Sequence, residues 1–160
     1  MIHNTLYVIS FDTTVAELLI MNNENANYLG IDWGATNIGV ALAHQETGVA
    51  LPYVTLKNDA DVLARLGKII ASENIATVVI GILEYLHQDG GLSAAEKFGQ
   101  SLTERFGVKV AYENEMFTTK MAQSNLIERG IKGASKNNDE EAARIILQEW
   151  LGKKSSGGQN

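Results

Sequence analysis

The chain has 160 residues, of which 45% are hydrophobic, and its formal net charge of −6 offers no overall attraction for nucleic-acid phosphates. This length suits one domain with an ordinary hydrophobic core. Because the chain has no cysteine and its three histidines lack a zinc-ligand spacing, disulfides and zinc or thiolate sites are excluded, and any metal site must be built from carboxylates.

The two ends of the chain differ from its middle. Residues 1–27 form an extension with a predicted strand at 5–11, a predicted helix at 15–21 and a polar linker. Either this extension adds a strand and a helix to the edge of the domain, or translation begins at Met21 and the first twenty residues are not part of the protein. Residues 153–160 are rich in Ser and Gly and predict a disordered tail. The domain itself is therefore expected over residues 28–152.

The first half of the domain predicts three short strands joined by short connections. They are expected at residues 28–31, 38–43 and 50–56, and a Gly-containing turn over 32–37 separates the first two. Connections this short predict an antiparallel meander.

The second half alternates helices and strands. Helices are predicted around residues 62–70, 93–106, 119–129 and 137–151, and strands at 76–82 and 108–112. The apolar run at 76–82 is typical of a strand buried on both faces. The chain thus predicts an α/β fold, in which a three-stranded meander continues into β-α-β-α-β to give a mixed five-stranded sheet with helices packed on it. No apolar run approaches a membrane span, and no signal-peptide pattern opens the chain, so a cytoplasmic protein without membrane contact is expected.

Asp32 is the first candidate for chemistry. Strand alternation places Tyr28, Gly30 and Asp32 on one face, with Asp32 at the end of a central strand. The alternative is that its carboxylate accepts hydrogen bonds from the turn and has only a structural role.

Glu115 is the second candidate. It follows the fifth predicted strand and precedes Thr118, a possible N-cap for the next helix. A glutamate at such a position can equally be a solvated strand-end residue. Glu113 lies two residues earlier, on the same strand face if the alternation persists, and is the rival carboxylate.

Asp139 is the third candidate, at the start of the final helix. Ala143, Ile146 and Trp150 follow at helical spacing, which places Asp139 at the end of the stripe that packs on the sheet. The alternative is an N-cap supported by the acidic residues that follow. An inward carboxylate needs a partner, and a pair of divalent ions would supply one.

Three segments carry a resemblance to a known family. The segment Tyr28-Leu-Gly-Ile-Asp-Trp-Gly-Ala-Thr-Asn-Ile-Gly-Val-Ala, the segment Asn114-Glu-Met-Phe-Thr-Thr and the segment Asp139-Glu-Glu-Ala-Ala-Arg-Ile-Ile-Leu-Gln resemble, in order and spacing, the motif blocks of the YqgF family of pre-16S rRNA nucleases and Holliday-junction resolvases.

The resemblance implies a ribonuclease-H-like fold with catalytic, metal-binding acids at Asp32, Glu115 and Asp139. It implies an endonuclease that hydrolyses phosphodiester bonds in structured RNA or branched DNA, with two Mg²⁺ or Mn²⁺ ions as cofactors. The expected role is maturation of the 5′ end of pre-16S rRNA, or resolution of Holliday junctions. Asp32 would contact both ions, and the other two acids would each hold one side.

The sequence departs from the family in residues that contact nucleic acid. The usual Asp-Glu-Arg is replaced by Asn114, Glu115 and Met116, and Leu83 stands where the family has proline. The basic cluster before the last aspartate is reduced to two lysines. The candidates for nucleic-acid contact are Lys120, Lys132, Lys136 and Arg144.

Two alternatives remain open. The departures also fit a catalytically degraded module that binds nucleic acid without cutting it. A less favoured alternative is a sugar-kinase or actin-like ATPase fragment, because residues 30–37 also resemble a first phosphate loop. Such proteins close two similar domains around a nucleotide, and no second phosphate loop is found in the sequence.

Overall fold

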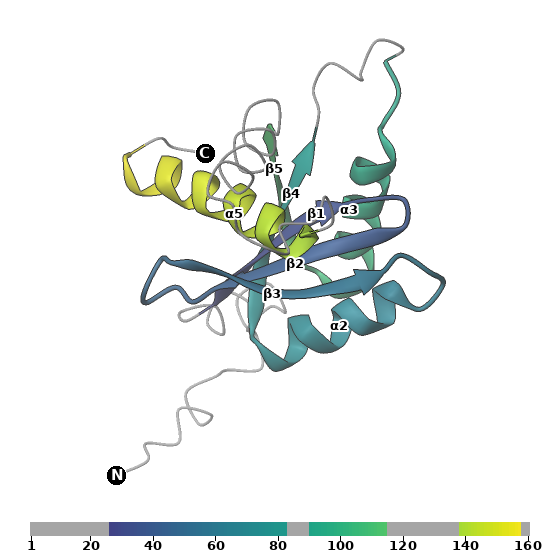
Figure 1. Ribbon diagram of the computed structural model, residues 1–160, viewed down its shortest axis with the longest axis horizontal. Helices are drawn as coiled ribbons and strands as arrows, with labels where there is room; N and C mark the ends of the chain where they lie inside the picture. The colour runs from purple at the N-terminus through teal and green to yellow at the C-terminus, as the bar shows by residue number, and fades with distance from the viewer. Residues whose placement is uncertain (1–25, 83–89, 115–137, 158–160) are drawn as a thin grey trace, which may run out of the picture.

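The computed structural model describes residues 26–82, 90–114 and 138–157. Their strands form one mixed sheet in the order β3-β2-β1-β4-β5 (Figure 1). β2 pairs antiparallel with both β1 and β3, whereas β4 pairs parallel with both β1 and β5. The strands are β1 (Asn27–Trp33), β2 (Asn37–Ala43), β3 (Ala50–Lys57), β4 (Ile75–Ile82) and β5 (Lys109–Asn114). The predicted meander continuing into β-α-β-α-β is therefore confirmed.

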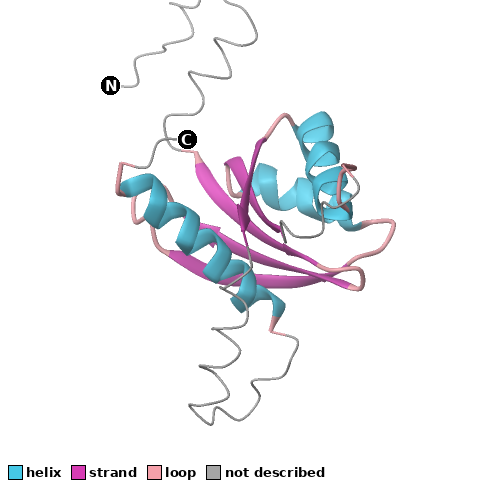
Figure 2. Ribbon diagram, turned by 90° about the horizontal axis from the view of Figure 1, so that it is seen from above, coloured by secondary structure: helices cyan, strands magenta, loops and turns pink. Residues whose placement is uncertain are grey.

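The described helices cover both faces of the sheet. α2 (Val62–Ser72) and α3 (Ala94–Phe106) lie on one face, and α5 (Asp139–Ser155) lies on the other (Figure 2). The larger core lies under α2 and α3, where one side of each central strand contributes Leu29, Ile31, Val40, Val78 and Ile80. A second core lies under α5 and is built from smaller side chains of the sheet, including Ala41, Ala43 and Val79.

Local sequence explains the ends and faces of the helices. α2 buries Val62, Leu66 and Ile70, which recur every four residues and so form one apolar stripe. α3 begins with a capping box between Ser93 and Glu96, which satisfies backbone N–H groups that its first turn leaves unpaired. It ends at Gly107, whose φ of 67° is a left-handed conformation that favours glycine.

Several element boundaries differ from the prediction by one or more residues, and two of these differences change how the sequence is interpreted. β1 continues through Asp32 and Trp33, because these residues pair with Gly39 and Ile38 and lengthen the hairpin into the predicted turn. α5 continues to Ser155 instead of ending near residue 151, so residues 153–155 are helical rather than part of a disordered tail.

Some predictions fall outside the described residues. These are the strand at 5–11, the helix at 15–21 and the helix at 119–129. Within the described ranges, no helix is long and apolar enough to cross a membrane.

Candidate metal and nucleic-acid site

Asp32 lies on the face of β1 that α5 covers. Gly30, two residues earlier on the same face, contacts this helix so closely that an added Cβ would lie 2.7 Å from the Cβ of Leu147 and 2.8 Å from the carbonyl oxygen of Ala143. The intervening residue, Ile31, belongs to the core on the opposite face. The alternation expected for β1 is therefore confirmed, and it directs Asp32 toward α5.

The first turn of α5 rests on β2 beside Asp32. A Cβ added at Gly39 would lie 2.9 Å from the Cα of Asp139 and would overlap its carbonyl oxygen. Gly39 is also the antiparallel partner of Asp32 in β1, and residues paired in this way lie on the same face of a sheet, with Cα atoms about 5 Å apart. The glycine thus allows the backbone that carries Asp139 to lie next to the strand position that carries Asp32.

Asp139 is the first residue of α5, and the N-cap position belongs to Asn138, whose side chain makes no capping hydrogen bond. Burial raises the pKa of the Asp139 carboxyl, and the neighbouring negative charge of Glu140 raises this pKa further. Both causes disfavour the ionised form. A cation bound at this carboxylate would act in the opposite direction and stabilise the charge.

Glu115 lies outside the described residues, directly after Asn114 at the end of β5. Its predicted role as a ligand therefore stays a prediction. Because β1, β4 and β5 are parallel, the end of β5 that leads to Glu115 is at the same edge of the sheet as Asp32. The strand register agrees with this. Ile80 of β4 pairs with Ile31 of β1, and the next β4 residue, Gly81, pairs with Glu113 of β5, so Asp32 and Glu113 follow at the same level of the sheet.

The rival carboxylate, Glu113, has a different partner. It is 6% exposed, which makes it the one buried charged residue of the described part of the chain. It forms an ion pair with Lys153 in the last turns of α5, so it faces the same helix as Asp32. This pair was not anticipated from the sequence. The signal that could have suggested it is the basic pair at 153–154, which suits the negative end of a helix dipole.

The predicted phosphate contacts fall in two groups. Lys120, Lys132 and Lys136 lie outside the described residues. Arg144 is within α5, and its guanidinium forms an ion pair with Glu141 at 2.7 Å. Part of its positive charge is therefore already neutralised within the helix.

Among the described residues, no group of three or more His, Asp or Glu side chains gathers as a metal-binding cluster. The described part of the site supplies two carboxylates, Asp32 and Asp139, on one face of the sheet. Carboxylate oxygens are the ligands that Mg²⁺ prefers, and this ion needs only one or two of them alongside water and phosphate oxygens. These two residues thus fit a divalent ion, and the third ligand expected from the sequence, Glu115, lies outside the described residues.

Comparison with known structures identifies the class of fold. The structure resembles T. thermophilus RuvC, solved in complex with a Holliday junction substrate, with a TM-score of 0.52 and 20% sequence identity, covering 83% of this chain and 97% of that chain. At this identity the likeness concerns the fold, which is ribonuclease-H-like as expected.

Sequence comparison then gives the family. Residues 26–153 match the family RuvX, described as Holliday junction resolvase. A protein of Lactococcus lactis subsp. lactis (strain IL1403) is 34% identical over 79% of this chain and 94% of its own length. A protein of Burkholderia vietnamiensis (strain G4 / LMG 22486) is 31% identical over 79% of this chain and 89% of its own length. Both carry the name "Putative pre-16S rRNA nuclease". The chain belongs to the RuvX family, also called YqgF, as the motif blocks predicted.

Proposed function

We propose that this protein is a metal-dependent endonuclease that hydrolyses phosphodiester bonds of nucleic acid. The observation that carries the proposal is the contact of Asp139 with Gly39, the strand partner of Asp32. It brings the start of the final helix next to the end of the central strand, which supports a shared site for two of the three proposed ligands, Asp32 and Asp139. The names of the relatives support the nuclease activity.

Each acid has a distinct role in this proposal. Asp32 would contact both of two Mg²⁺ or Mn²⁺ ions, because it lies in the central strand between the elements that lead to the other two acids. Asp139 would hold one side and Glu115 the other. When bound, such ions supply an activated water and stabilise the leaving oxygen, without requiring a histidine as general base. The partial burial that raises the pKa of Asp139 also strengthens the attraction of its carboxylate for a bound cation.

The relatives point to pre-16S rRNA as the first substrate to test, and the family description points to a four-way DNA junction as the second. We propose cleavage near the immature 5′ end of the 16S rRNA. A cytoplasmic location, expected from the sequence, would match this substrate.

A non-catalytic module that binds nucleic acid is the second candidate. It is favoured by Asn114, which ends β5 where the family has an aspartate. The loss of this carboxylate leaves the three proposed ligands in place but removes a neighbouring negative charge. Metal binding does not distinguish the two candidates, whereas catalytic turnover does.

The test is a cleavage assay with purified full-length protein on a pre-16S rRNA fragment and on a four-way junction. The reactions should contain Mn²⁺ or Mg²⁺, and parallel reactions should contain a chelator instead. Low ionic strength is needed, because the reduced number of basic residues predicts weak binding that falls steeply with salt. Cleavage that requires metal supports the nuclease. Folded protein that cuts neither substrate would shift the conclusion to the binding module.

A further inference from the structure

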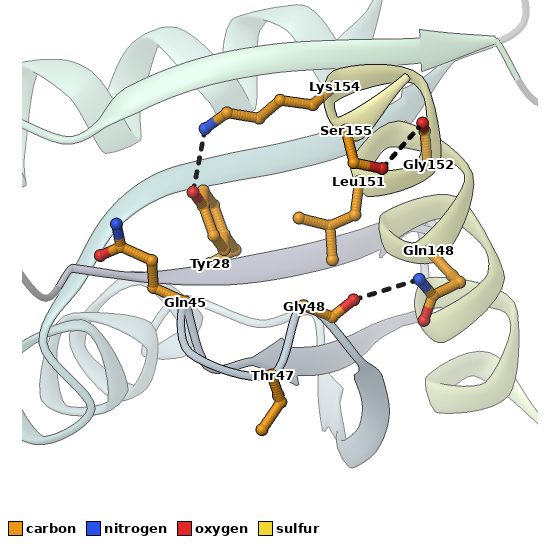
Figure 3. Close-up of a pocket in the computed structure, with 9 residues that line it drawn as sticks. All are labelled: Tyr28, Gln45, Thr47, Gly48, Gln148, Leu151, Gly152, Lys154 and Ser155. Carbon is orange, nitrogen blue, oxygen red and sulfur yellow. Dashed lines mark hydrogen bonds between the residues drawn. The ribbon is translucent and has the colours of Figure 1, made fainter. Parts of the chain in front are cut away.

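A cavity of about 430 Å³ lies at the other end of α5 from Asp139, between this helix and the loop that joins β2 to β3 (Figure 3). Tyr28 of β1 and Leu151 of α5 give it apolar surface, and Gln45 and Lys154 give it polar groups. This volume is within the range of pockets that bind small organic groups. Neither Asp32 nor Asp139 lines this cavity.

The walls of the cavity are held in place by one side chain of α5. The Oε1 atom of Gln148 accepts a hydrogen bond from the backbone N–H of Ala50 at 2.9 Å, and its Nε2 donates to the carbonyl oxygen of Gly48 at 3.2 Å. The loop between β2 and β3 is therefore tied to the helix. The helix wall and the loop wall of the pocket are therefore fixed relative to each other before a ligand binds.

The side-chain ammonium of Lys154 lies against two aromatic rings at the pocket. The Nζ atom of Lys154 donates to the hydroxyl of Tyr28 at 2.9 Å and lies 4.7 Å from the centre of its ring. The same atom is 5.2 Å from the centre of the Trp150 ring, and the two rings are 5.6 Å apart. Both rings favour the ammonium at this position. Because an ammonium has three donors, Lys154 can also bind an anion that enters from solvent.

We propose that this pocket binds one nucleotide of a single-stranded segment of nucleic acid. Lys154 contacts its phosphate, the ring of Tyr28 and the side chain of Leu151 contact its base, and the amide of Gln45 donates to and accepts from the base edge. Aromatic surface next to a positive charge is the combination that proteins use to bind single strands. The base must be unpaired to enter, so a continuous duplex is excluded. This inference rests on the proposed function, because it assigns a feature of the substrate.

The position of the pocket sets the spacing in the substrate. Tyr28 and Asp32 lie on the same face of β1, four residues apart, which corresponds to about 13 Å at ~3.3 Å per residue. The preferred substrate therefore has an unpaired nucleotide within a few nucleotides of the bond that is cut.

The fluorescence of Trp150 can report on the pocket. The chain has two tryptophans, and Trp33 packs on the opposite face of the sheet. Trp33→Phe removes this second signal, and within the described structure the buried indole N–H of Trp33 has no hydrogen-bond partner to lose. Full-length protein with this substitution would be titrated with a short single-stranded RNA, in a chelator and at low salt. We expect saturable quenching of Trp150, and weaker binding of the same RNA as a duplex.

Two substitutions and a matched control identify the contacts. Tyr28→Leu should weaken binding of the single strand by at least about fivefold, the lower end for losing a base that stacks on an aromatic side chain. Lys154→Met should also weaken it, and this loss should shrink as salt is added, because it removes a phosphate contact. Lys154 is exposed, so Lys154→Met stays informative if Tyr28→Leu fails to fold. Lys97→Met, an equal loss of charge on an exposed residue of α3, should bind like the parent.

The outcomes separate this proposal from the proposed function. The proposal that the pocket binds a nucleotide is overturned if the parent, Lys154→Met and Tyr28→Leu bind the single strand with equal affinity. It is also overturned if the RNA does not bind at all, or if fluorescence anisotropy of the RNA shows binding while the fluorescence of Trp150 does not change. If Lys154→Met and Tyr28→Leu weaken binding as predicted, the nucleotide pocket is supported even if the protein cuts neither substrate. In that case only the nuclease proposal fails.

Discussion

The backbone of Asp139 rests directly on Gly39, and no side chain fits between them. The contact joins residues that are a hundred positions apart, and it sets where α5 begins over the sheet. Since Gly39 pairs with Asp32, this contact also sets the position of Asp139 relative to Asp32.

Gly39→Ala should therefore disturb both stability and metal binding. The added Cβ overlaps backbone atoms, which cannot move as a flexible side chain can, so α5 must shift. We expect a loss of about 3 kcal/mol in the free energy of unfolding, the upper end for overpacking. The affinity for Mn²⁺ should fall as well. Denaturant unfolding measures the first effect, and isothermal titration calorimetry the second. Gly91→Ala is the control, because an added Cβ there meets nothing within 4 Å. Equal stability of the two variants would contradict the account.

The ion pair between Lys153 and Glu113 predicts that the effects of substituting its two members on stability are coupled. Lys153→Met leaves the buried carboxylate of Glu113 without its partner and should cost about 1–3 kcal/mol of stability. Adding Glu113→Gln to Lys153→Met should recover part of the loss, because the unpaired charge is gone. Urea denaturation of the two single variants and the double variant gives the coupling energy. Strictly additive losses would show that the pair does not act as a unit.

The raised pKa of Asp139 predicts how metal-free stability depends on pH. A carboxyl with a higher pKa in the folded state binds its proton more readily there than in the unfolded chain, so stability falls as pH rises from the ordinary pKa through the raised one. Asp139→Asn removes this ionisation. In a chelator, this variant should melt at a higher temperature than the parent at neutral pH, and the difference should shrink as pH falls through that window. A difference that is the same at every pH would contradict the assignment.

Added Mg²⁺ or Mn²⁺ should raise the melting temperature of the parent. A ligand that binds only the folded state stabilises it by about 2.7 kcal/mol at a hundredfold excess over its Kd. Asp32→Asn should lose most of this response, whereas Asp61→Asn, at an exposed carboxylate next to α2, should keep it. Thermal scans with and without metal decide the point. The same metal response in Asp32→Asn and the parent would remove Asp32 from the site.

Much of the fold could be predicted from the sequence because its signals are local. Alternation in β1 assigned Tyr28, Gly30 and Asp32 to one face, and the stripe from Ala143 to Trp150 assigned the buried face of α5. The end of α5 was missed because Ser and Gly after residue 154 resemble a disordered tail, whereas the helix continues through Lys153, which pairs with a carboxylate 40 positions away.

The candidate site was less accessible to prediction. The contact of Asp139 with Gly39 depends on where a helix crosses a sheet, which periodicity does not determine. The glycines of β1 and β2 offered a hint, since a strand glycine marks a close approach of backbone. The sequence could not choose between Glu113 and Glu115, and only the contact with Lys153 shows that Glu113 has a partner of its own. The nucleotide pocket combines residues from β1, a loop and α5, which no single motif contains.

We propose above all that Asp32 and Asp139 hold the same metal site. Electron paramagnetic resonance of Mn²⁺ tests this shared site most directly, because it measures free and bound ions separately. The proteins to compare are the parent, Asp32→Asn, Asp139→Asn and the double variant. We predict that each single substitution weakens binding at least about tenfold, or ~1.4 kcal/mol, and that the double variant is little worse than the weaker single variant, because residues of one site are not additive. Parent-like Mn²⁺ binding in Asp32→Asn or Asp139→Asn, with the fold intact, would contradict the account.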